Sequence, residues 1–194
     1  PLPVIVWVHG GGWQGGSKAN VLPLRLGFLA KGFAVASLGY RLTDTAVFPV
    51  PIQDCKAAVR WLRAHAKDYG LDPARFAAWG SSAGGHLVAL LGTAGDVKEF
   101  EVGDHLSESS RVQAVVDYYG PSDLLLFFDT PGYATHRRPD SPESKLIGGL
   151  VVENKDKAAA ASREFAGIRA KHSDFTGGQP VDLQKIINFF LFLR

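Results

Sequence analysis

The sequence predicts an α/β protein whose sheet is doubly wound and mostly parallel. Two observations lead to this prediction. Short apolar runs rich in β-branched residues lack the polar alternation of half-exposed strands, as expected of strands buried on both faces of a parallel sheet. These runs alternate along the chain with segments of helical periodicity, which is the order of βαβ units.

Each element can be placed by its residues. The strands are expected at residues 2–8, 33–38, 76–79 and 112–118. The first helix is expected to open at Asn20, to carry Leu22, Leu26 and Leu29 as its apolar stripe, and to stop at Gly32.

A second helix is predicted where apolar residues repeat at steps of three and four, with the basic residues on the other face. These apolar residues are Ile52, Cys55, Val59, Leu62 and Ala66. We expect this helix to end at Gly70. Another helix should leave from Ala83, and a final amphipathic helix is expected over residues 180–193.

Composition favours one soluble globular domain over residues 1–194, with 46% hydrophobic and 21% charged residues. The net charge of +2 indicates no nucleic-acid partner, and no apolar run approaches the roughly 20 residues of a membrane span. The single cysteine, Cys55, excludes an internal disulfide and is expected to be a buried thiol. Because the chain lacks Met and runs from Pro1 straight into a strand, we expect the native N-terminus to be absent, which leaves localisation unknown.

The chemistry is expected where a strand passes through Gly80-x-Ser82-x-Gly84 into a helix. A serine on such a sharp turn is typical of the nucleophile elbow of a hydrolase. The glycines are needed because side chains at 80 and 84 would crowd the turn and the neighbouring strand. The positive end of the following helix favours negative charge that develops at the serine.

The glycine loop after the first strand has two interpretations. Gly10-x-Gly12-x-x-Gly15 matches a dinucleotide-binding fingerprint, but the helix opens too late and no acidic residue ends the second strand. In the favoured interpretation, the amides of Gly11, Gly12 and Ala83 form an oxyanion hole for an ester attacked by Ser82. No cofactor or metal is expected.

The segments HGGGW (9–13) and GSSAGGH (80–86), in this order, resemble the α/β-hydrolase superfamily. More narrowly, the chain resembles hormone-sensitive-lipase-like esterases and the related bacterial acetylxylan/feruloyl esterase-like (BD-FAE-like) proteins. Segments 37–42, 48–54 and 119–123 support the resemblance, which covers roughly residues 1–161. It implies an abbreviated α/β-hydrolase fold, with residues 121–161 as an excursion over the active edge, and Ser82 as the nucleophile.

The chain departs from that family in two places. The strands that precede the first one are absent, and after Ala161 the strand and motif that deliver the acid of the catalytic triad are missing. The base is expected at His172, because the fold needs the order Ser before His and the loop resembles the family's histidine loop, with a surface histidine outside the site as the alternative interpretation. His9 is expected to orient the glycine loop, His86 to pack, and His136 is a weaker candidate base.

The candidate acid is Asp123, just past the fourth strand, although a role in capping the turn after Pro121 is the stronger interpretation. The sequence therefore predicts a serine hydrolase of small carboxylic esters that acts through an acyl-enzyme. One alternative is a catalytically weak or inactive hydrolase-fold binding domain, and another is an amide or formamide hydrolase of the same fold. An exposed sheet edge would favour a homo-oligomer.

Overall fold

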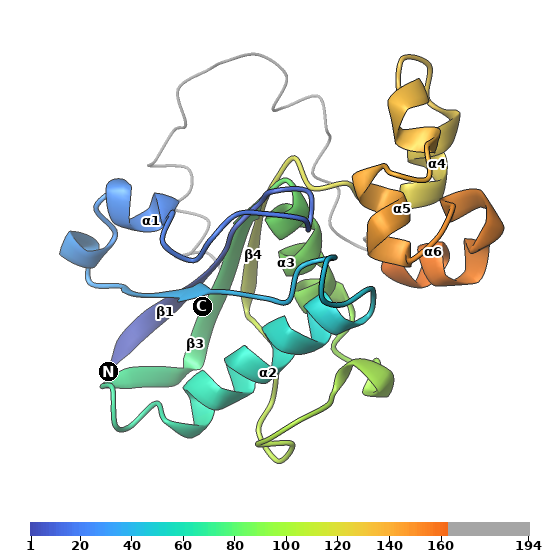
Figure 1. Cartoon of the computed structure of the whole chain (residues 1–194). Helices are drawn as coiled ribbons and strands as arrows, with labels where there is room; N and C mark the ends of the chain where they lie inside the picture. Colours follow the sequence, from blue (N-terminus) through green and yellow to red (C-terminus); the bar gives the residue numbers. More distant parts are fainter. Residues whose placement is uncertain (163–194) are drawn as a thin grey trace.

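A parallel sheet forms the centre of the molecule (Figure 1). The structure is a computed structural model that describes residues 1–162. Within them the sheet has four strands in the order β2-β1-β3-β4, all parallel. The strands are β1 (Leu2–Val8), β2 (Ala34–Leu38), β3 (Leu71–Ser81) and β4 (Ala114–Tyr118). The α/β class and all four predicted strands are confirmed, and β3 begins five residues earlier than expected.

The strand ends line up at one edge of the sheet. Val8 pairs with both Leu38 and Gly80, and Gly80 pairs in turn with Asp117. The segments that follow these strands therefore leave from the same level. This register brings the loop after β1, the turn after β3 and the loop after β4 to one place, although they are far apart in the sequence.

Helices cover both faces of the sheet (Figure 1). On one face, α2 (Val50–Ala64) and α3 (Ala83–Thr93) pack on a large apolar cluster that includes Val4, Val6 and Val8. On the other face, α1 (Leu22–Arg25) and the residues beside it cover a smaller cluster. Its buried members are Ile5, Trp7, Phe28 and Trp79. Alternate residues of β1 thus point to opposite faces, as a strand buried on both sides requires.

The first predicted helix is wrong in its start and its continuity. Val21, not Asn20, precedes α1, and the carbonyl of Asn20 instead accepts a hydrogen bond from Trp7 Nε1 at 2.8 Å. Pro23 sits in the first turn and Gly27 takes a φ of +72°, so α1 ends after one turn. A separate 3₁₀ turn, η1 (Leu29–Lys31), follows.

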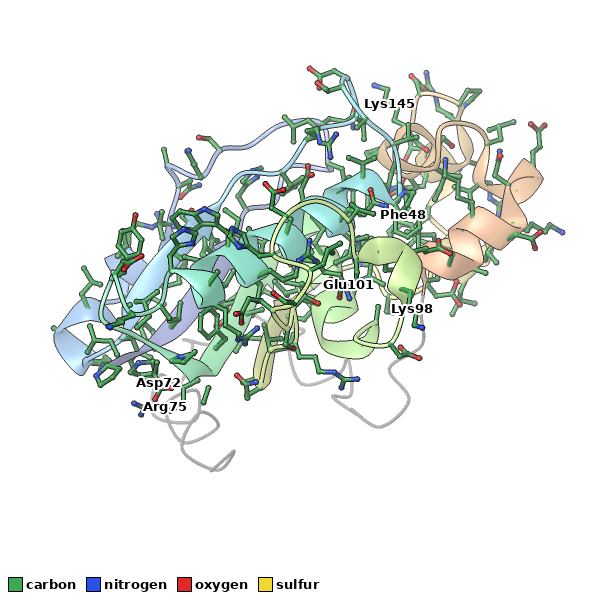
Figure 2. The ribbon with its side chains drawn as sticks, turned by 90° about the horizontal axis from the view of Figure 1, so that it is seen from below. Phe48, Asp72, Arg75, Lys98, Glu101 and Lys145 are labelled. Atoms are coloured by element: carbon green, nitrogen blue, oxygen red, sulfur yellow. The ribbon has the colours of Figure 1, made fainter. Side chains whose placement is uncertain are left out.

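The basic residues of α2 are also not where the helical pattern put them. Lys56 and Arg60 are fully buried and both bind the carboxylate of Glu101, which follows the 3₁₀ turn η2 (Lys98–Phe100) beside α2 (Figure 2). Lys56 Nζ lies 2.7 Å from Glu101 Oε1 and donates to the carbonyl of Ala94. A buried charge that finds such partners can enter a core that the amphipathic pattern reserves for apolar residues. The helix ends at Ala64, and turns lead on to Gly70.

Residues after β4 form a group of short helices beside the carboxyl ends of the strands (Figure 1). They are α4 (Leu124–Asp129), η3 (Ala134–Arg137), α5 (Pro142–Ile147), η4 (Val151–Glu153) and α6 (Lys155–Ala161). Several of their apolar residues belong to the main core, as Leu124, Leu146 and Val151 are completely buried, whereas Leu126 and Val152 are exposed. The helix expected over 180–193 lies outside the described residues. No helix within residues 1–162 is long and apolar enough to cross a bilayer.

One buried imidazole ties this helical group to the core. His86 of α3 donates from Nε2 to the carbonyl of Ala161, at 2.7 Å, and its ring meets the edge of Trp13. Burial lowers the pKa of His86 to about 4, although the hydrogen bond to Ala161 acts in the other direction. The imidazole is therefore neutral at neutral pH, and the expectation that His86 packs is confirmed.

We expect Glu101→Gln to destabilise the protein by about 3–5 kcal/mol, because Lys56 and Arg60 stay buried without a carboxylate. The matched control is Asp72→Asn, which breaks a solvent-exposed pair with Arg75 (Figure 2) and should change stability little. Urea unfolding followed by circular dichroism measures both. Equal midpoints for the two variants would contradict the assignment of Glu101 as a structural counter-ion.

We also expect His86 to make the folded state acid-sensitive. The unfolded chain binds a proton at this residue below about pH 6.5, whereas the folded chain resists it until about pH 4. Stability that is present above pH 6.5 is thus lost as the pH falls towards 4, by up to about 3 kcal/mol. His86→Gln should flatten this part of the free energy of unfolding against pH, and the exposed-site control His105→Gln should not. Parallel curves of unfolding free energy against pH for wild type and His86→Gln would contradict this role of His86.

Candidate active site

Ser82 occupies the turn between β3 and α3 with an unusual backbone. Its φ is +54° and its ψ is −122°, a region that non-glycine residues rarely adopt. Two backbone hydrogen bonds hold it there: Ser82 N–H donates to the carbonyl of Tyr118 at 2.8 Å, and the carbonyl of Ser82 accepts from His86 N–H at 3.0 Å. The first bond fixes the turn to the end of β4, and the second starts α3. The strained turn predicted from the sequence is therefore present.

The neighbouring glycines are required by contact distances. A Cβ on Gly80 would lie 2.2 Å from the carbonyl oxygen of Gly84, and one on Gly84 would lie 2.1 Å from that of Val8. Both contacts are with backbone, which cannot move aside as a flexible side chain can. Gly84 therefore lets α3 pack directly on the end of β1, and Gly80 lets the turn close on itself.

The glycine loop after β1 lies against this turn. A Cβ on Gly10 would be 3.3 Å from the Cβ of Ser82, and only 2.7 Å from the carbonyl oxygen of Ser81. Beyond Gly10, three successive residues have positive φ: +121° at Gly11, +58° at Gly12 and +57° at Trp13. The carbonyl of Gly11 accepts hydrogen bonds from the amides of the two residues after Trp13, so this conformation is internally braced.

His9 is fixed at the start of the loop. Its ring stacks on Tyr40 with centroids 4.6 Å apart, and its Nδ1 lies 2.8 Å from the carbonyl of Gly10. The Tyr40 hydroxyl donates to the carbonyl of His9 at 3.1 Å. Burial, followed by the nearby Cys55, raises the pKa of Tyr40, so this hydroxyl stays a donor at neutral pH. These contacts agree with an orienting role for His9.

Three donors expected in an oxyanion hole thus come from elements in contact. Gly11 and Gly12 belong to the braced loop, and Ala83 is the first residue of α3. The N–H of a first helical residue has no partner inside its own helix, and the helix dipole adds positive potential there. Within residues 1–162, no three His, Cys, Asp or Glu side chains gather as a metal site would need.

The described residues do not bring the expected acid and base of the triad together. Asp123 caps α4, with Oδ1 accepting from the amides of Leu125 and Leu126 at 2.8 and 2.9 Å. This is the capping role that the sequence favours as the stronger interpretation. His172 lies outside the described residues. His136, the weaker candidate base, lies in η3 and pairs through Nδ1 with the buried Glu143 at 3.0 Å.

Two residues of this region were not found by sequence reasoning. Asp117, the penultimate residue of β4, accepts from Gly120 N–H at 2.8 Å, and its Oδ1 would lie 2.2 Å from a Cβ on Gly85. Pro142, the first residue of α5, lies 3.4 Å from the position of a Cβ on Gly12. Asp117 could have been found from the sequence, because an aspartate at the end of an apolar strand is a recognisable signal. The contact of Pro142 depends on how the chain returns after β4, which no local pattern reveals.

Known proteins resemble this chain over most of the described part. The probable carboxylic ester hydrolase LipM of Mycobacterium tuberculosis is 35% identical over 66% of this chain and 30% of its own length. Carboxylesterase NlhH of the same organism is 40% identical over 46% of this chain and 28% of its own. The chain therefore spans about 30% of the length of the curated relatives it matches.

Solved structures give the same picture. A bifunctional GH43-CE protein of Bacteroides eggerthii has a TM-score of 0.74 at 38% identity, covering 82% of this chain and 22% of that one. A truncated carbohydrate esterase from gut microbiota has the same TM-score at 32% identity, covering 83% and 60%. The thermophilic esterase Est2 of Thermogutta terrifontis has a TM-score of 0.62 at 31% identity, covering 83% and 54%.

These neighbours assign the sheet with its flanking helices to an abbreviated α/β-hydrolase fold. The sequence profile of the BD-FAE family matches residues 1–166, which include the glycine loop, the turn at Ser82 and the helical group after β4. The chain belongs to the BD-FAE family.

Proposed function

We propose that this chain hydrolyses small carboxylic esters through an acyl-enzyme formed on Ser82. The observation that carries the proposal is the backbone of Ser82, a non-glycine residue held at a φ of +54° between β3 and α3. Strain of this kind costs about 1–3 kcal/mol and persists where the surrounding structure enforces it, often because the site needs it. The relatives named as esterases support the same chemistry.

In the proposed reaction, Ser82 Oγ attacks the ester carbonyl carbon while its proton passes to an imidazole. The negative oxygen that forms is stabilised by the amides of Gly11, Gly12 and Ala83, which need no rearrangement because the loop and the helix start are already fixed. The imidazolium then gives its proton to the departing alcohol. A water molecule, deprotonated by the same imidazole, attacks the acyl-enzyme; the bond from the acyl carbon to Ser82 Oγ then breaks, the acid leaves, and the imidazolium returns its proton to Ser82 Oγ.

The proposed imidazole is His172, and Asp123 is the proposed acid that orients it. The two amides bound by Asp123 occupy Oδ1, which leaves Oδ2 as the oxygen that would accept from an imidazole N–H. His86 is unsuited to the role, because its Nε2 donates to Ala161 and its pKa is near 4. An imidazole that is half protonated only near pH 4 is a weak base at neutral pH.

The proposed substrates are acyl esters carried by carbohydrates. Two structural relatives that cover more than four-fifths of this chain are described as a GH43-CE protein and a carbohydrate esterase. An amide of the same acid would meet the same oxyanion donors, so a formamide or peptide substrate is the comparison to run beside the ester. A binding domain without turnover is the other outcome that the tests distinguish.

We expect Ser82→Ala to abolish hydrolysis of p-nitrophenyl acetate and to abolish covalent labelling by a fluorophosphonate. Loss of the nucleophile removes about 10⁶ in kcat in a well-studied serine hydrolase, so residual turnover should fall to the background. Intact-protein mass spectrometry of the labelled wild type reports the adduct, and peptide mapping locates it. Absence of any serine adduct in the wild type, or equal slow turnover by both proteins, would favour the binding domain.

We expect Gly11→Ala to lower kcat by about 10²–10³, the usual effect of losing one oxyanion donor. Its Cβ would lie 2.3 Å from the carbonyl oxygen of Gly15, at a φ of +121°, so the loop must rearrange. The control is Gly27→Ala, which also places alanine at a positive φ but meets nothing within 4 Å. Kinetics at matched folded fraction separate the two. If both variants lose activity equally, backbone strain and not the amide is responsible.

A further inference from the structure

A second feature lies on the surface of α2, near its C-terminal end. We call it the α2 notch, a hollow of about 340 Å³, and its lining residues are Ala57, Ala58, Trp61, Gly103, Asp104 and His105. This volume is at the lower end of the range for small-molecule sites, which is about 300–1,000 Å³. Because α2 runs towards the amino ends of the strands (Figure 1), the notch lies away from Ser82.

The notch is bordered by an ordered set of exposed aromatic rings. The side chain of Trp61 is 42% exposed, and the ring of His65 stacks against it with centroids 4.2 Å apart and planes 21° apart. Tyr69, 61% exposed, lies 5.8 Å from Trp61, and His105 meets the edge of His65 at 5.3 Å. His65 Nδ1 donates to the carbonyl of Trp61, which fixes the imidazole. The aromatic surface is therefore held in place before anything binds.

The far wall of the notch is held from beneath. Arg60 is fully buried and donates to the carbonyls of Val102 and Asp104, with Nε 3.2 Å from the latter. The same guanidinium binds Glu101. One side of α2 thus holds the loop at 101–104 through Arg60, while Ala57 and Trp61 of the same helix line the notch. A preformed site loses less conformational entropy on binding than a flexible one.

The side chains that line the α2 notch have the chemistry that binds a sugar. A pyranose ring has an apolar C–H face, which packs on an aromatic plane, and a rim of hydroxyl groups, which need hydrogen-bond partners. Trp61 offers the plane, and Asp104 and His105 offer an acceptor and a ring nitrogen at its rim. An apolar helix would instead cover the carboxylate of Asp104 without a partner, which is costly.

We propose that the α2 notch is a secondary binding site for a neutral pyranose unit of a polysaccharide, stacked on Trp61. The inference rests on the proposed function, since a carbohydrate ester carried by a polymer gives such a site its use. A chain held at the notch keeps its other esters at a raised local concentration near Ser82, without occupying the active site.

Trp61 provides a direct optical test. The other three tryptophans, Trp7, Trp13 and Trp79, are buried, so Trp61 is the tryptophan whose emission reports the surface. Xylohexaose or cellohexaose added to the Ser82→Ala protein should shift this emission to shorter wavelength and saturate in the millimolar range or below. Use of Ser82→Ala makes the result independent of turnover, so failure of the esterase proposal leaves this test intact.

Variants then assign the site by affinity electrophoresis in gels that contain soluble arabinoxylan. Trp61→Ala should weaken retardation about tenfold, a change that corresponds to roughly 1.4 kcal/mol, whereas Trp61→Tyr should retain most of it. Leu29→Ala, which removes an even more exposed apolar side chain elsewhere, should migrate like wild type. Circular dichroism confirms that each variant is folded.

Three outcomes would overturn the proposal. These are no emission shift with either oligosaccharide, retardation unchanged in Trp61→Ala, or loss of self-association in Trp61→Ala by light scattering without any effect of sugar. The last would assign the notch to a second copy of the chain.

Discussion

The site depends on one steric constraint, the approach of α3 to the end of β1 through Gly84. A Cβ there would overlap the carbonyl of Val8, so any other residue would push the helix away from the sheet. The same approach sets where α3 begins and therefore where Ala83 presents its amide. Ser82, next to this helix start, has a φ of +54°. This contact thus sets where the N-terminal end of α3, and with it the positive end of the helix dipole, lies beside Ser82.

The sheet was predictable because its strands are buried on both faces, and such strands need continuous apolar sequence. The failures have local causes. The stripe of Leu22, Leu26 and Leu29 has helical spacing, but Gly27 interrupts the backbone that would join them. In α2 the amphipathic rule failed because Lys56 and Arg60 bind the half-buried carboxylate of Glu101, which is 41 to 45 residues away in the sequence. The sequence of α2 alone does not indicate that a counter-ion so far along the chain will neutralise its buried charges.

The candidate site likewise has residues that the sequence could predict and residues that it could not. Ser82 and its glycines could be recognised because the turn imposes residue types at adjacent positions, which makes the signal local. The carboxylate at Asp123 could not be assigned from the sequence, since an aspartate in the loop after β4 suits both the capping of α4 and the orientation of an imidazole. Pro142 contacts the glycine loop across 130 positions of sequence, and only the return path of the chain brings it there.

The neutral imidazole of His86 has a consequence for how the protein is made. It joins Trp13, in the glycine loop, to Ala161, at the end of the helical group, so contacts of the loop span nearly the whole described chain. Contacts between such distant residues form late, since loop closure must come first. On a ribosome the strands can pair before the helical group has emerged, but the contact between His86 and Ala161 can form only after residue 161 has emerged. Completion of the contacts from Trp13 through His86 to Ala161 is thereby coupled to formation of the distal helices.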